Sequence, residues 1–314
     1  MPVIKTIYGQ LTTPDWPDDL IVRTLVTYGE WSLAEQMLLA PMVRGDDCFW
    51  DVGAFLGTFG LGVSHLAAQP PRDLVVVEPS SVLQHHLREN LTRNAPCPFQ
   101  IAPFAVANHV GLLSPREDQS PLNAGGVKYE HAVGIEATVA CRPLKDLRAE
   151  YGDYDVLKLD IEGMENEAIL SDRGYIQTKR PIIWAECNED TSSIDLLETL
   201  IELNYNPIYV AFPFFRKNNY NATSARIFPM AYEAVLLAAP PDRLADFTGK
   251  VDGEEIIVRP VNNADELRQA LWSTPRWALS DWVCLSKAEL IARLGRASQS
   301  QLFETFLIRD NIEL

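Results

Sequence analysis

Residues 48–79 read CFWDVGAFLGTFGLGVSHLAAQPPRDLVVVEP, and this segment decides the fold. A short apolar run, a glycine turn, a helical stretch and the aliphatic run at 74–77 indicate a strand, a turn, a helix and a second strand. Four aliphatic residues without alternation are typical of a parallel strand that is buried on both faces. Glu78 closes this strand 25 residues after Gly53, where a nucleotide-binding unit places the acceptor for its ribose hydroxyls. The segment therefore predicts a nucleoside-binding βαβ unit.

The composition of the glycine turn favours S-adenosylmethionine over a dinucleotide. A dinucleotide fingerprint requires G-x-G-x-x-G, so that the backbone can approach a pyrophosphate. Here Phe55 stands at the position of the second glycine if Gly53 is the first. If Gly60 and Gly62 are the first two, His65 stands at the position of the third. Asp51 adds a negative charge that suits a sulfonium cofactor with an ammonium group better than a pyrophosphate.

The overall composition limits the partners. The 314 residues include 27 Lys and Arg against 43 Asp and Glu, a net charge of −16. Such a surface repels phosphate backbones and anionic lipids, so we expect neither nucleic acid nor a membrane as a partner. Five scattered cysteines without C-x-x-C spacing argue against a zinc site and a disulfide framework. Without a leader-like start or an apolar run of membrane-spanning length, the sequence predicts a soluble, cytoplasmic protein.

Further strands also end in acidic residues. The aliphatic run at 156–159 ends in Asp160 and continues as Ile-Glu-Gly-Met-Glu, and residues 181–186 form another strand that ends in an acid. Ligands bind beyond the carboxyl ends of parallel strands, so the acids there should share one site. Glu165 is expected instead to stabilise the N-terminus of the next helix. The acids assigned to the site are Asp51, Glu78, Asp160, Glu162 and Glu186.

A cluster of carboxylates is costly unless a cation occupies it. A sulfonium cofactor meets part of that need, and a divalent metal is the alternative. Asp160, Glu186 and Asn188 offer the hard oxygen ligands that Mg²⁺ or Ca²⁺ accepts. We expect no metal, and therefore expect chelators to leave the activity intact.

The chain is expected to divide into three parts. Residues 1–45 form an N-terminal helical cap with a capping box at Ser32–Glu35. Residues 46–240 form the cofactor-binding domain, in which residues 99–106 are a third strand. A Pro-Pro pair at 240–241 marks the start of a partly helical appendage, residues 241–314. Its aromatic anchors are expected to pack against the main domain; the alternatives are an interface or a platform for a sugar. A homodimer is a possible assembly of the protein. The appendage features are Trp272, Trp277, Trp282 and a capping box at Ser286–Glu289.

Several motifs resemble those of FkbM methyltransferases, a family of class I methyltransferases. The turn Asp51–Gly57 resembles D-x-G-A-N-x-G, with Phe55 in place of the usual asparagine. The string K-x-D-x-E-G-x-E at 158–165 is the most characteristic of the matches. The resemblance covers residues 18–240. The other matching segments are Tyr28-Gly-Glu-Trp31, Leu122-Asn-Ala-Gly-Gly126 and Asn218-Asn-Tyr-Asn221.

The resemblance implies a fold, a reaction and a set of site residues. The fold is a Rossmann-like α/β fold, in which a mostly parallel seven-stranded sheet has helices on both faces, with the N-terminal cap and C-terminal appendage added. The reaction is methyl transfer from S-adenosyl-L-methionine to a hydroxyl of a sugar, glycan or polyketide-type small molecule. The catalytic candidates are Asp160, Glu162 and His131. The cofactor-binding candidates are Tyr28, Glu30, Asp51, Gly53, Ala54, Gly57, Glu78, Pro79, Phe104, Ala105 and Asp160.

Two other classes of function stay open at this point. A nicotinamide-dependent oxidoreductase could use a similar sheet, although the broken glycine fingerprint disfavours it. A non-catalytic protein could keep the cofactor fold without turnover, since Phe55 alters the turn.

Overall fold

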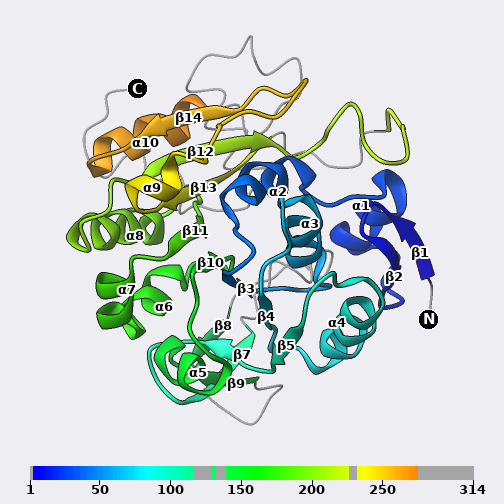
Figure 1. Ribbon diagram of the computed structural model, residues 1–314, viewed down its shortest axis with the longest axis horizontal. Coiled ribbons are helices and arrows are strands. Elements are labelled where there is room, and N and C mark those ends of the chain that lie inside the picture. The colour runs from blue at the N-terminus through cyan, green and yellow to red at the C-terminus, as the bar shows by residue number, and fades with distance from the viewer. Residues whose placement is uncertain (1–2, 116–128, 132–138, 226–231, 275–314) are drawn as a thin grey trace.

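The computed structural model describes residues 3–115, 129–131, 139–225 and 232–274 (Figure 1). Several features named above lie outside the described residues. They are the segment Leu122–Gly126, Trp277, Trp282 and the capping box at Ser286–Glu289.

An eight-stranded sheet forms the centre of the molecule. The parallel strands are β11 (Ile182–Glu186), β10 (Val156–Leu159), β3 (Cys48–Val52), β4 (Asp73–Val77) and β5 (Phe99–Ala102), in that order. Beyond β11 the sheet continues with β13 (Tyr232–Ala238), β12 (Ile208–Pro213) and β14 (Ile257–Pro260), and all three of these pairings are antiparallel. The sheet is therefore mixed, and it has one strand more than the seven expected.

The extra strand comes from the segment expected to be a helical appendage. β14 pairs with β12, and α10 (Ala264–Ser273) packs against α8 (Thr191–Glu202). Leu267, Ala270 and Leu271 of α10 belong to the main hydrophobic core. Residues 257–274 thus share the core of the domain. The short helix α9 (Pro241–Leu244) precedes them and has no buried residues, although Leu244 packs against the cluster on the other face of the sheet.

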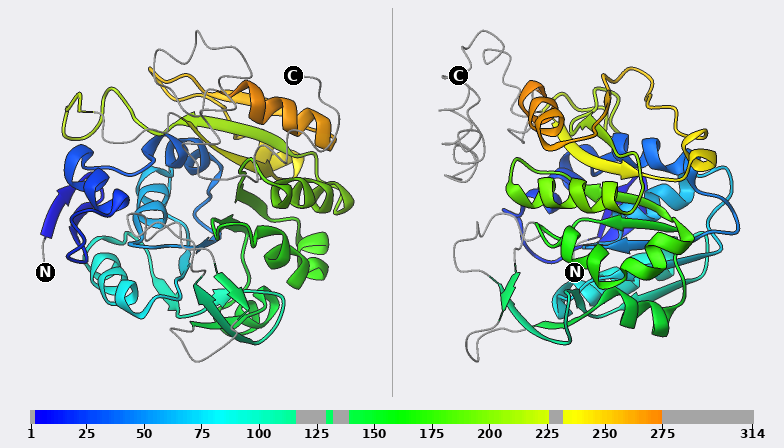
Figure 2. Two further views of the ribbon diagram at one scale, coloured as in Figure 1. Left: turned by 180° about the vertical axis from the view of Figure 1, so that it is seen from behind. Right: turned by 90° about the vertical axis from the view of Figure 1, so that its left-hand side faces the viewer.

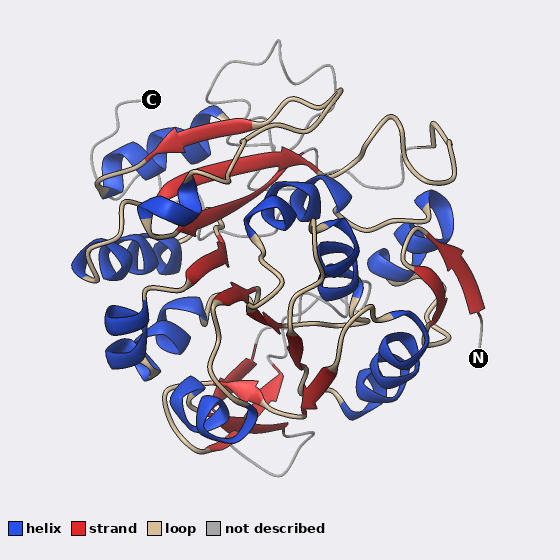
Figure 3. Ribbon diagram, viewed as in Figure 1, coloured by secondary structure: helices blue, strands red, loops and turns tan. Residues whose placement is uncertain are grey.

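Two layers of helices cover the two faces of the sheet, as Figure 2 and Figure 3 show. One layer consists of α5 (Leu144–Tyr151), α6 (Glu165–Ser171), α7 (Arg173–Lys179), α8 and α10. The other consists of α1 (Leu20–Tyr28), α2 (Leu33–Leu39), α3 (Thr58–Leu66) and α4 (Ser81–Asn94). Side chains of the buried strands alternate between these layers: Trp50 packs on the first, and Phe49 packs on the second. No described helix has both the length and the apolar character to cross a membrane.

The N-terminal cap contains the two expected helices and a hairpin that was not expected. β1 (Val3–Thr6) pairs antiparallel with β2 (Gly9–Thr12), and the short 3₁₀ turn η1 (Ala40–Met42) follows α2. The capping box at Ser32–Glu35 was a wrong prediction. The Ser32 hydroxyl donates to the Glu35 carboxylate (3.1 Å), and that carboxylate turns into the core to accept the indole N–H of Trp184 (2.7 Å).

The predicted third strand at 99–106 is two strands in different sheets. β5 ends at Ala102, and β6 (Ala105–Val106) belongs to a small four-stranded sheet, because Pro103 has no N–H with which to continue the ladder. The small sheet has the order β6, β9 (Val139–Arg142), β7 (Gly111–Pro115) and β8 (Tyr129–His131). It follows the carboxyl end of β5 directly along the chain.

Candidate functional site

The acids expected at one site gather because four parallel strands end side by side. β11, β10, β3 and β4 are neighbours in the sheet and run in the same direction. We call the side of the sheet where they end the carboxyl edge, and the side where they begin the amino edge. Asp51, Glu78, Asp160 and Glu186 all come from the carboxyl edge, as their positions in the sequence predicted.

The glycine turn contacts the ends of both strands that flank β3, namely β4 and β10. The N–H groups of Gly53 and Ala54 donate to the carbonyl of Val77 at the end of β4 (3.0 and 3.1 Å). Gly53 has φ +82°, and a Cβ there would lie 1.9 Å from the carbonyl oxygen of Asp160. Only glycine fits this close approach, which places the turn directly against the residue that follows β10. Gly57, with φ +81°, then begins α3 as its N-cap.

Asp51 is fully buried and both of its carboxylate oxygens face groups of the protein. Oδ2 accepts the backbone N–H of Gly60 in the first turn of α3 (2.9 Å), and Oδ1 lies 3.2 Å from the ammonium nitrogen of Lys158. Burial raises the pKa of Asp51, and Lys158 opposes that shift. Since Asp51 is fully buried, a direct contact with a cofactor would require the groups that cover it to move.

Lys158 lies among the predicted site residues but was not itself among the candidates. It lies inside β10, is 3% exposed, and contacts Asp51, Asp160 Oδ2 (3.1 Å) and the carbonyl of Gly53 (3.1 Å). Burial alone lowers the pKa of a lysine, but the charges of Asp160 and Asp51 outweigh this and the pKa of Lys158 is raised. A lysine inside an otherwise aliphatic strand, two residues before a strand-end acid, was the signal that could have identified it.

Glu78 joins the glycine turn to the start of α4. Its carboxylate accepts the backbone N–H of Phe55 (3.0 Å) through one oxygen and that of Ser80 (2.8 Å) through the other. The side chain is buried, and burial raises its pKa to about 7. Each carboxylate oxygen can accept a second hydrogen bond, so Glu78 can still receive ribose hydroxyls while it holds the turn.

Three acids form a compact group between β10 and β11. One oxygen each of Asp160, Glu162 and Glu186 lies within 4.8 Å of the others. The side chain of Asp160 is 45% exposed, and the backbone of Glu162 is left-handed, with φ +57°. Oε2 of Glu186 is buried and meets no hydrogen-bond partner among the described residues. Burial, together with the charges of Glu162 and Asp160, raises the pKa of Glu186 well above its usual value.

This group has the chemistry to accept a cation. Carboxylate oxygens at these separations could ligate a divalent metal, with Glu162 in the set where the sequence suggested Asn188. They could equally face the positive charge of a ligand. Glu165 is not part of the group in this sense, because its carboxylate accepts the backbone N–H groups of Ile161 and Gly163 and so holds the loop before α6. The expectation was a structural role too, but at the N-terminus of the next helix rather than in the loop before it.

Tyr28 and Glu30, expected over the cofactor, are engaged by the segment after β12. Glu30 is 4% exposed; it contacts Arg216 Nη1 (3.3 Å) and accepts the backbone N–H of Tyr220 (2.8 Å). The ring of Tyr28 lies 5.0 Å from that of Phe215. Trp31 and Phe214 form a similar pair, with ring centroids 4.8 Å apart. We call these contacts between residues 28–31 and 214–221 the clasp.

The remaining predicted residues take several different positions. Ala54 is buried in the glycine turn, and Pro79 follows Glu78 with its carbonyl accepting from Gln84 (3.2 Å). Phe104 carries the Arg142 guanidinium 5.0 Å above its ring, and Ala105 begins the small sheet in β6. The catalytic candidate His131 lies on β8, where its backbone pairs with Leu113.

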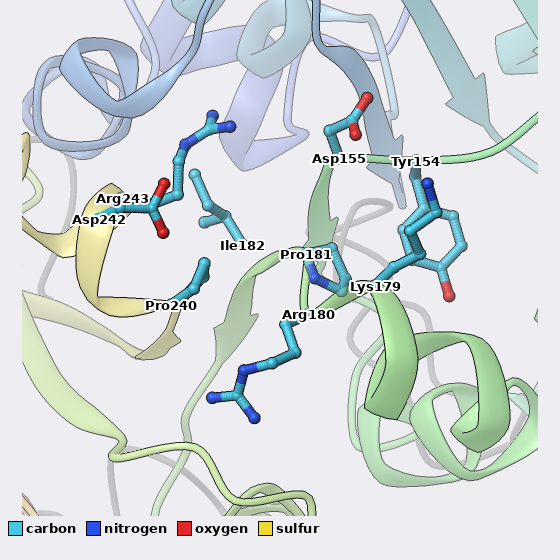
Figure 4. A pocket seen from close by; sticks show the side chains of 9 residues that line it. All are labelled: Tyr154, Asp155, Lys179, Arg180, Pro181, Ile182, Pro240, Asp242 and Arg243. Atoms are coloured by element: carbon cyan, nitrogen blue, oxygen red, sulfur yellow. The ribbon is translucent and has the colours of Figure 1, made fainter.

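A pocket of about 320 Å³ lies at the opposite, amino edge (Figure 4). It is bordered by Asp155 before β10, by Pro181 before β11, and by α9. The pocket lies where the strands begin, and none of the residues predicted for the site lines it. The other lining residues are Tyr154, Lys179, Arg180, Ile182, Pro240, Asp242 and Arg243.

Comparison with known proteins gives a sequence match and several looser structural ones. The family model of the methyltransferase FkbM domain matches residues 51–221, more than half of the chain. The matched span contains the glycine turn, Glu78, Lys158 and the three-acid group. No curated protein matches the sequence.

Solved structures resemble the chain at low sequence identity. The FkbM methyltransferase from Methylobacillus flagellatus KT is 15% identical with a TM-score of 0.43; the match covers 72% of this chain and 55% of that one. This chain therefore spans little more than half of that protein. The precorrin-6y C5,15-methyltransferase from Geobacter metallireducens is 14% identical, with a TM-score of 0.38 and coverages of 65% and 86%. A precorrin-8w decarboxylase from Methanobacterium thermoautotrophicum is 11% identical, with a TM-score of 0.40 and coverages of 73% and 93%.

Proposed function

The chain belongs to the FkbM methyltransferase family, and from this premise we propose that it transfers a methyl group from S-adenosyl-L-methionine to a hydroxyl oxygen. The proposed acceptor is a sugar, glycan or polyketide-type small molecule. The observation that carries the proposal is the position of Asp160. Its half-exposed carboxylate follows β10, its backbone touches Gly53 of the glycine turn, and one of its oxygens is held by Lys158.

The residues at the carboxyl edge fit a cationic cofactor. Glu186 presents a buried oxygen that has no partner among the described residues, beside the carboxylates of Glu162 and Asp160. When bound, S-adenosylmethionine supplies an activated methyl carbon, which an acceptor oxygen can attack while the electron pair of the broken C–S bond leaves with sulfur. The negative charge of the three-acid group would favour the sulfonium form over the neutral thioether product.

The chain's own residues would align the acceptor and take its proton. Asp160 is the first choice as general base, because it is the most accessible acid next to the turn. Proton removal by a positioned base contributes roughly 10²–10⁴-fold to a rate. Alignment of the two reacting atoms can supply about 7–11 kcal/mol, so most of the catalysis would come from positioning. Glu162 and His131 remain the alternatives for the base.

Two measurements test the proposal. Titration calorimetry should show binding of S-adenosylmethionine and none of NAD. An assay for S-adenosylhomocysteine should then show turnover with one of a panel of sugars, glycans and polyketide-type alcohols, with equal rates in EDTA. Absence of S-adenosylmethionine binding would reject the proposed function. Binding without turnover on any acceptor would favour a non-catalytic cofactor-binding protein, and loss of turnover in EDTA would make the three-acid group a metal site.

A further inference from the structure

We propose that Lys158 is a positioning residue, which fixes the glycine turn and Asp160 in one arrangement so that cofactor and acceptor meet correctly. The inference rests on the proposed function. Lys158 is almost completely buried, so it acts through the groups that it holds rather than by touching a substrate.

The contacts of Lys158 join three separate points of the carboxyl edge. Its ammonium nitrogen lies 3.2 Å from Asp51 Oδ1 in β3, 3.1 Å from the Gly53 carbonyl in the turn, and 3.1 Å from Asp160 Oδ2 after β10. The ammonium group donates a hydrogen bond to the Gly53 carbonyl and forms ion pairs with the two carboxylates. Contacts that involve an ionised group are stronger than those between neutral groups, so this single nitrogen links the positions of all three segments.

The sheet itself fixes where the ammonium group lies. Lys158 in β10 is paired in register with Asp51 in β3 on one side and with Trp184 in β11 on the other. Residues in register on parallel strands point to the same face. Trp184 donates to Glu35 of α2, and the ring of Phe59 in α3 lies 5.2 Å from the ammonium nitrogen. The lysine is therefore enclosed, and its side chain has few alternative positions.

Asp160 needs such a tether because its other neighbours are negative. Its carboxylate follows the strand end, is 45% exposed, and approaches two further acids. Repulsion from these would turn the carboxylate away from the turn if Lys158 did not attract it. The charged groups that face Asp160 are Lys158 from β10, Asp51 from β3, Glu35 from α2, Glu162 from the following loop, Glu165 from α6 and Glu186 from β11.

The test distinguishes loss of positioning by Lys158 from two other effects of removing it, the change in net charge at the site and the loss of folding stability. Lys158→Met keeps the length of the side chain but removes the ammonium group, and it leaves Asp51 buried without its partner. The double variant Asp51→Asn/Lys158→Met removes both charges of that pair, which is far less destabilising than removing one. Lys145→Met, on the exposed side of α5, is the matched control.

Calorimetry with S-adenosylmethionine and S-adenosylhomocysteine gives the main result. We expect both Kd values to rise by about tenfold or more in Lys158→Met, the size expected for one charge-assisted hydrogen bond. The double variant should recover its Tm but not its affinities. A charge effect alone would instead favour the sulfonium over the thioether.

Hydrogen exchange in the free protein tests, without a ligand, whether Lys158 restrains the glycine turn and the loop after β10. The turn at 53–57 and the loop at 160–164 should exchange faster in both Lys158 variants than in Lys145→Met. The inference is overturned if the folded double variant binds both compounds within threefold of the wild type, or if its turn exchanges at the wild-type rate. Failure of the wild type to bind either compound would refute the proposed function instead, and the exchange result would still decide the role of Lys158.

Discussion

The two edges of the parallel sheet both carry acids but compensate their charges differently. At the amino edge, Asp47 is held by the guanidinium of Arg243 and by the backbone N–H of Arg44 (2.7 Å). Asp155 accepts the backbone N–H of Cys48 (2.9 Å). At the carboxyl edge, by contrast, Asp51 and Asp160 share one ammonium group.

The other acids of the carboxyl edge show the same shortage of positive charge. Burial raises the pKa of Glu78 and of Glu165 to about 7 and that of Glu35 to about 8. Oε2 of Glu186 has no partner among the described residues. Perturbed carboxyls of this kind gather where function requires them. From this comparison we infer that a ligand is to be expected at those strand-end acids whose charge is incompletely balanced.

The largest expected effect concerns the amino edge. Arg243→Met leaves the 4%-exposed carboxylate of Asp47 without its cation, and breaking a buried pair in this way costs about 3–5 kcal/mol of folding stability. Urea unfolding measures the loss. Binding of S-adenosylmethionine by the folded fraction should not change, because the pair is at the far end of the strands. In the control Asp47→Asn/Arg243→Met, most of the stability should return; weaker cofactor binding in either variant would contradict the contrast between the edges.

The next effect concerns catalysis. Asp160→Asn is nearly isosteric but cannot take a proton, so turnover at saturating S-adenosylmethionine should fall roughly 10²-fold or more while the cofactor affinity is retained. The matched variant at the amino edge is Asp155→Asn, which should keep full turnover. A loss of affinity with turnover preserved would make Asp160 a cofactor residue, and the base would then be Glu162 or His131.

A smaller effect is expected at Glu78. If its carboxylate accepts the ribose hydroxyls, Glu78→Ala should weaken S-adenosylmethionine binding by about 1.5–3 kcal/mol, the usual range for a hydrogen bond to a charged group. Calorimetry measures this. Glu78→Gln serves as the comparison, because its amide keeps one acceptor oxygen for the backbone N–H of Phe55 or Ser80. Unchanged affinity in a folded Glu78→Ala variant would remove Glu78 from the site.

The smallest expected effect is a pH dependence of stability. With raised folded-state pKa values, Glu35, Glu78 and Glu165 keep protons between about pH 4.5 and 8 that the unfolded chain has lost. The free energy of unfolding therefore decreases, and the protein becomes less stable, as the pH rises through this range. Glu35→Gln keeps an acceptor for Trp184 but has no proton to lose. It should be about 1 kcal/mol more stable than the wild type near pH 6 and equal to it near pH 5, since each pH unit over which only the unfolded chain has lost the proton costs the wild type about 1.4 kcal/mol. Thermal unfolding at the two pH values measures this, and a difference between variant and wild type that is the same at both would contradict it.

Local patterns predicted the elements that form the site. The strands at 48–52 and 74–77, the glycine turn and the strand before Asp160 could all be placed, because aliphatic runs without alternation between glycine or acidic residues are typical of buried parallel strands. β14 was not predicted, because its four residues, Ile-Val-Arg-Pro, lie at an exposed edge and show almost no alternation of apolar and polar side chains. The third strand was drawn too long because the interruption at Pro103 was overlooked.

The errors at the site arose from contacts across long sequence separations. Glu35 fits a capping box locally, but its partner Trp184 is 149 residues away. Lys158 was read as part of a motif, and its pairing with Asp51 became visible only in the register of β10 with β3. We expected a ligand to balance the strand-end acids, but the first cation that does so is Lys158 of the chain itself.

The clasp has a consequence for synthesis of the protein. Glu30 receives the backbone N–H of a residue 190 positions later, so the contacts of the clasp cannot form until that segment has left the ribosome. At ordinary rates of elongation this delay is about 10–40 s, during which the aromatic side chains of Tyr28 and Trp31 lack the rings that later cover them. Nascent chains stalled at lengths on either side of this point should differ in protease resistance near residue 30. We therefore expect residues near position 30 to become resistant to proteases, and to stop binding chaperones, only after both segments of the clasp have been synthesised.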